Sequence, residues 1–70
     1  MPSKYYKTKI VTVEDIINEK IKVLQDFYIV DAENEESIRN MLITAVRDNP
    51  HRDPNVVVDG IAKTLIAEKL

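Results

Sequence analysis

The chain has 70 residues, 44% of them hydrophobic and 31% charged, and its formal net charge is -2. This ordinary globular mixture excludes collagen-like, low-complexity and wholly disordered chains, and the length allows a single small domain. Because cysteine is absent, disulfide scaffolds, zinc–thiolate sites and cysteine nucleophiles are excluded as well.

A basic arm, partly extended, is predicted over residues 1–12. It carries three lysines and no acid, a charge of +3, whereas residues 13–36 carry eight acids and two lysines, a charge of -6. Cations and aromatic rings are interleaved in the arm, as in segments that neutralise phosphates and stack on bases; these residues are Lys4, Tyr5, Tyr6, Lys7 and Lys9. The arm is therefore a candidate nucleic-acid contact, and the alternative is a solvated, partly disordered tail.

The same arm loosely fits the ribbon-helix-helix class of DNA-binding dimers, in which an N-terminal strand pairs with its two-fold mate in the major groove. The order strand, helix, helix agrees with that class. The acidic first helix and the additional third helix disagree with it, and no arginine precedes residue 39 to make bidentate base contacts. A nucleic-acid-binding regulator that uses the arm is thus the alternative function.

The first helix is predicted from about residue 13 to residue 29. Thr12 and Asp15 form a capping-box pattern at its start. Apolar residues then recur at intervals of three and four, which is one stripe of a helix: Val13, Ile16, Ile17, Ile21, Leu24, Phe27 and Tyr28. Lys20 falls inside this stripe, so we expect its stem to pack while its ammonium reaches solvent; the alternative is an ion pair across an interface or a contact with a partner.

The second helix is predicted over residues 35–49, with Asn34 as its cap and Pro50 preventing its continuation. Its apolar stripe has no gap: Ile38, Met41, Leu42, Ala45 and Val46. The acids around its start do not form a helix-loop-helix calcium loop, because the sixth and twelfth positions counted from Asp31 hold Glu36 and Leu42 instead of glycine and glutamate.

The third helix is predicted over residues 54–69, with Asp53 as N-cap and Pro54 at the first helical position. Its stripe comprises Val58, Ile61, Ala62, Leu65 and Ile66. The competing interpretation is a short strand over residues 55–58 that enters a turn, because three β-branched residues and a mid-segment glycine lower helix propensity. The Asp-Pro start and the unbroken stripe favour the helix.

No catalytic or metal-binding constellation emerges from the sequence. His51 lies between two acids before the third helix, but weakly spaced ligands on a short loop make a poor metal site, and a polar surface loop is the better interpretation. A single glycine excludes phosphate-cradling loops. We therefore expect a non-enzymatic protein without cofactor, metal or small-molecule substrate. With no apolar run of about 20 residues and no secretory signal, we expect it to be cytoplasmic and not to bind membranes.

Size makes a protein partner the leading functional expectation. A chain of this length buries only about 60% of the surface that it exposes when unfolded, and such domains often depend on a partner chain. We expect an all-α, three-helix bundle over residues 13–70 that works as an adaptor or regulator, by homodimerisation or by docking on another protein. The candidate contact residues are Lys20, Ile29, Ile43, Val56, Gly60 and Ala67.

Overall fold

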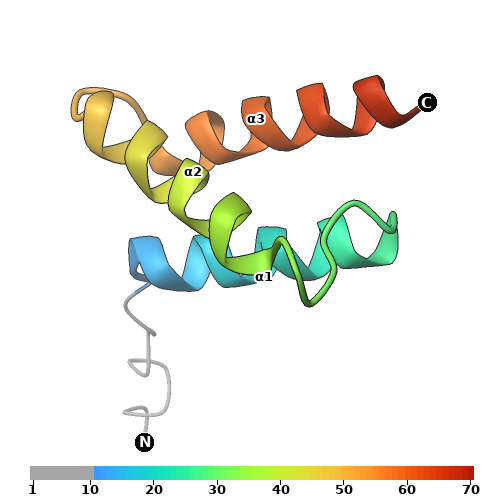
Figure 1. Cartoon of the computed structure of the whole chain (residues 1–70). Coiled ribbons are helices and arrows are strands. Elements are labelled where there is room, and N and C mark those ends of the chain that lie inside the picture. Colours follow the sequence, from blue (N-terminus) through green and yellow to red (C-terminus); the bar gives the residue numbers. More distant parts are fainter. Residues whose placement is uncertain (1–10) are drawn as a thin grey trace, which may run out of the picture.

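A computed structural model describes residues 11–70, and within that range it contains three helices and no strand. The helices are α1 (Val13–Asp26), α2 (Glu35–Asp48) and α3 (Pro54–Lys69). α1 and α3 run in the same general direction, and α2 crosses them obliquely on its way back (Figure 1). The predicted all-α, three-helix fold is confirmed, and the strand considered for residues 55–58 is excluded because these residues lie inside α3. The predicted arm falls almost entirely outside the described residues.

Two helices begin where their local chemistry predicts. At α1 the backbone N–H of Asp15 donates to Thr12 Oγ1, and the N–H of Thr12 donates to Asp15 Oδ2, both at 3.1 Å. At α3 the Asp53 carboxylate accepts a hydrogen bond from the N–H of Asn55 at 2.9 Å, and Pro54 occupies the first turn. These caps satisfy N–H groups that lack a partner inside the helix, and proline has no N–H to satisfy.

The first helix ends three residues earlier than predicted. The N–H of Tyr28 donates to Gln25 O at 2.9 Å, and the N–H of Ile29 donates to Leu24 O at 2.8 Å. This bond pair closes the helix as a Schellman motif, with Tyr28 in the left-handed position at φ 61°. The chain then turns away, so Phe27 and Tyr28 leave the apolar stripe predicted for them and are 47% and 83% exposed.

The connection from α1 to α2 is held by its own side chains. The prediction that the Asn34 side chain caps α2 is wrong, because that side chain is used within the loop. It accepts a hydrogen bond from the N–H of Asp31 at 2.7 Å and donates one to Ile29 O at 2.9 Å. In return the Asp31 carboxylate accepts from the N–H groups of Glu33 and Asn34, both at 2.9 Å. We call this arrangement, over residues 29–34, the loop clasp.

The core lies where the three helices meet, and every buried side chain among the described residues is apolar. The four large side chains that are almost fully inaccessible come from all three helices: Ile17, Leu24, Leu42 and Val58. A polar link lies at the edge of the core, where Arg39 of α2 donates to Asn18 of α1 and pairs with Glu35. Apolar burial therefore determines how the helices pack.

Candidate functional site

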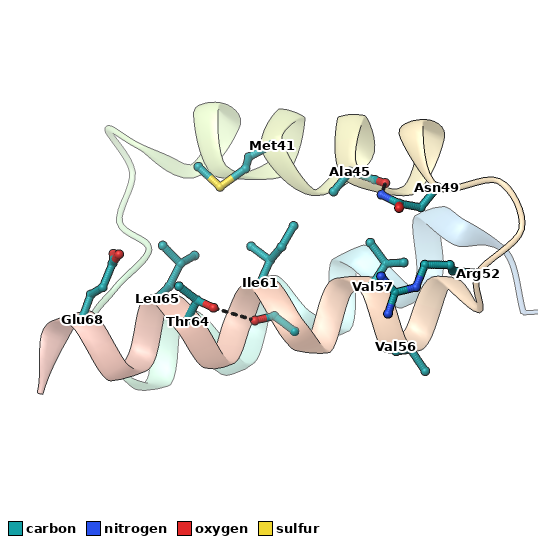
Figure 2. A pocket seen from close by; sticks show the side chains of 11 residues that line it. Met41, Ala45, Asn49, Arg52, Val56, Val57, Ile61, Thr64, Leu65 and Glu68 are labelled. Carbon is teal, nitrogen blue, oxygen red and sulfur yellow. Dashed lines mark hydrogen bonds between the residues drawn. The ribbon is translucent and has the colours of Figure 1, made fainter.

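A groove of about 540 Å³ runs between α2 and α3, with α1 behind it (Figure 2). Most of its lining is apolar, and both helices contribute. The lining residues are Met41 and Ala45 of α2, Asn49 and Arg52 of the connecting loop, and Val56, Val57, Gly60, Ile61, Thr64, Leu65 and Glu68 of α3.

The groove exists because α3 is apolar over more of its circumference than the core can cover. Residues four apart form rows along one side of a helix, and α3 has three adjacent rows of small or apolar residues. The first row, Val58, Ala62 and Ile66, packs on the core. The second row, Val57, Ile61 and Leu65, is buried or half-buried and also lines the groove. The third row, Val56, Gly60 and Thr64, is exposed and forms the outer rim. The second and third rows are the α3 wall of the groove.

Two polar side chains that line the groove are hydrogen-bonded to backbone carbonyls four residues before them. Asn49 Nδ2 donates to Ala45 O at 2.7 Å, and the Thr64 hydroxyl donates to Gly60 O at 3.0 Å (Figure 2). What remains for a ligand is mostly methyl and methylene surface. Such a surface binds apolar groups, and it provides no converging acid–base pair for catalysis.

Charged side chains of opposite sign mark the two ends of the groove. Arg52 lies near the start of α3, and Glu68 lies near its end (Figure 2). Within residues 11–70 neither of them takes part in an ion pair. The groove therefore has a direction, since a ligand that carries charge at its ends fits it better one way round than the other.

Lys20 is engaged within the chain. Its side chain is 23% exposed, and its Nζ lies 3.2 Å from Asp59 Oδ1 of α3. Lys63 Nζ lies 3.1 Å from the other oxygen of the same carboxylate, Asp59 Oδ2. The hydrogen bonds from Lys63 and Lys20 hold the pKa of Asp59 below its ordinary value, against the opposing effect of burial. Lys20 thus links α1 to α3, and a role for it in binding a partner stays a prediction.

The other predicted contact residues fall into two environments. Val56 and Gly60 line the groove, and Ala67 is exposed on α3 outside its lining. Ile29 and Ile43 are half-buried and pack against the core, so both are less accessible than the off-stripe positions suggested. The candidate nucleic-acid contacts lie outside the described residues: Lys4, Tyr5, Tyr6, Lys7 and Lys9.

Sequence reasoning missed most of the groove. Met41, Ile61 and Leu65 were predicted as parts of helical stripes, yet Met41 is 44% exposed and the other two are only half-buried. A usable signal was the run of three valines at residues 56–58. Consecutive helical residues are about 100° apart, so three of them span about 200°, which is more than one buried face can cover.

A second, smaller pocket of about 260 Å³ lies between α1 and α2, and its lining residues are Val13, Glu14, Ile17, Arg39 and Ile43. Between residues 11 and 70 no three His, Asp or Glu side chains are grouped as metal ligands would be, and His51 is exposed. None of the three helices is long and apolar enough to cross a bilayer. No known family, curated protein or solved structure matches the chain. The α2–α3 groove is consequently the site that geometry favours.

Proposed function

We propose that this protein is a small, non-enzymatic interaction module that receives a helix of its partner in the α2–α3 groove. The observation that carries the proposal is the groove itself, an apolar channel at the surface with opposite charges at its two ends. Helix-in-groove recognition uses this combination, because apolar anchors at helical spacing fill the channel and charges at the rim set the direction. Such a binding role suits an adaptor or regulator in the cytoplasm, the setting that the sequence favours.

Docking covers apolar side chains that solvent now reaches. Val56 is 53% exposed and Met41 44% exposed, and both line the groove. Each Å² of apolar surface removed from water contributes about 25 cal/mol, and the entropy cost of association is subtracted from the total. Apolar burial is therefore the main contribution that we expect the groove to make to binding.

A matched pair of variants tests the proposal. Val56→Glu puts a charge in the groove, whereas Val23→Glu makes the same change at an exposed position of α1 outside it. We expect Val56→Glu to weaken self-association in sedimentation, or capture of a specific protein from nuclease-treated lysate, by at least about tenfold, because an unpaired carboxylate would have to be buried. We expect Val23→Glu to behave like the wild type.

Circular dichroism verifies that both variants keep the helical fold. If Val56→Glu binds and sediments as the wild type does, the groove is not the docking surface. Binding that disappears on nuclease treatment and ignores Val56→Glu instead supports the alternative, a nucleic-acid contact through residues 1–12.

A further inference from the structure

We propose that the occupant of the groove is a second copy of this chain. In this arrangement α3 of each copy lies in the α2–α3 groove of the other, antiparallel, around a two-fold axis that passes beside Gly60. The inference rests on the proposed function, since it names the partner that fills the same groove. Two-fold interfaces are the commonest in homodimers, and they require a surface that is complementary to itself.

The charges at the ends of the groove meet that requirement. Arg52 precedes Gly60 by eight residues, and Glu68 follows it by eight. A two-fold axis at Gly60 therefore brings Arg52 of each copy to Glu68 of the other, which gives two contacts between opposite charges. A parallel pairing would instead bring Arg52 to Arg52 and Glu68 to Glu68, so charge selects the antiparallel arrangement.

Neither the backbone conformation nor the packing of the described chain requires a glycine at position 60. It lies in the interior of α3, where alanine is the more stable residue, and it does not have a positive φ. A Cβ atom built on it meets no heavy atom within 4 Å among the described residues. At the crossing point of two helices, by contrast, the missing side chain lets the backbones approach closely.

The surface around Gly60 also matches itself. Val56 lies four residues before Gly60 and Thr64 four residues after it, so the antiparallel pairing sets Val56 of one copy against Thr64 of the other. Met41, Ile61 and Leu65, which solvent partly reaches in the single chain, flank this contact in the groove. The pairing adds a second apolar layer to a chain whose own core is small.

Charge reversal tests the pairing directly. Arg52→Glu turns both contacts into Glu–Glu, and Glu68→Arg turns both into Arg–Arg. We expect each variant alone to dimerise on the order of 10- to 30-fold more weakly than the wild type at low salt, measured by sedimentation equilibrium. Mixing the two variants in equal amounts restores both attractive contacts, so a heterodimer of near wild-type affinity is expected. Lys22→Glu, on the exposed side of α1, makes the same change in net charge as Arg52→Glu and is the control for that variant.

The outcomes separate the inference from the proposed function. A wild type that stays monomeric at about 1 mM overturns the inference, and so does a dimer that the charge reversals leave unchanged. In either case the comparison of Val56→Glu with Val23→Glu still tests whether the groove is the docking surface. If the groove binds a different protein, the proposed function stands, and only the inference that a second copy fills the groove is overturned.

A steric variant gives an independent check. Gly60→Leu adds a large side chain where the single chain has open space, and leucine is a strong helix former, so the fold is expected to survive. We expect at least a tenfold loss of dimer affinity, with an unchanged circular dichroism spectrum. Dimerisation that is unaffected by Gly60→Leu contradicts an axis beside Gly60.

Discussion

Replacing Tyr28 by glycine is expected to stabilise the fold, because Tyr28 holds a backbone conformation that suits glycine. Its φ is 61°, and for an L-residue the left-handed region costs about 1–2 kcal/mol. The ring is 83% exposed, so its removal forfeits little packing. Glycine loses about 0.5–1 kcal/mol of chain entropy on folding, which leaves a net gain of about 0.5–1 kcal/mol. For a domain of this size that gain raises the melting temperature by about 3–6 °C.

Two control variants isolate the backbone effect in thermal and urea unfolding followed by circular dichroism. Tyr28→Ala removes the ring but keeps the Cβ atom, so no gain is expected. Lys22→Gly introduces glycine in the exposed middle of α1, where a loss of about 1 kcal/mol is expected. If Tyr28→Gly is no more stable than Tyr28→Ala, the left-handed residue carries no removable strain and the reasoning is refuted.

Three further predictions concern the core, the ion pairs and α3. Leu42→Ala deletes a fully buried side chain, so urea unfolding should show a loss of about 2–5 kcal/mol, and a smaller loss contradicts the packing. Because the pKa of Asp59 is lowered, its ionised form stabilises the fold above the ordinary pKa of 3.8, and this contribution declines as the pH falls through the lowered pKa. Asp59→Asn should therefore be less stable than the wild type near neutral pH and equally stable in strong acid. If the difference in unfolding free energy between the two proteins is the same at both pH values, the ionisation of Asp59 does not stabilise the fold. Gly60→Ala should stabilise the monomeric chain by about 0.5–1 kcal/mol in urea unfolding. A lower unfolding free energy than that of the wild type would contradict the open space around the Cβ position of residue 60.

Helix starts were predictable because their chemistry is local. Thr12 with Asp15, and Asp53 with Pro54, satisfy N–H groups within a few residues of themselves. The end of α1 was not predictable in the same way, because the left-handed position holds Tyr28 in place of the glycine that normally marks it. Asn34 resembled a cap, but its side chain is used in the loop clasp.

The candidate site was harder to foresee because it depends on contacts between distant residues. The position of Lys20 in an apolar stripe was evident from the sequence, yet its partner Asp59 lies 39 residues away. Similarly, helical spacing places Ile61 and Leu65 on one side of α3 without saying how far α2 covers that side. Only the packing of the helices shows that part of the predicted core is the wall of a groove.

The loop clasp has a consequence for the order of folding. Its side-chain hydrogen bonds join residues at most five apart, whereas α3 is tied to α1 through Lys20–Asp59, 39 residues apart, and through the bond from Lys69 Nζ to Tyr28 O, 41 residues apart. Short loops close at a smaller cost in chain entropy, so we expect the α1–α2 corner to form before α3 docks. Because α3 supplies one wall of the groove, the surface proposed for docking exists only after α3 has packed on the other two helices.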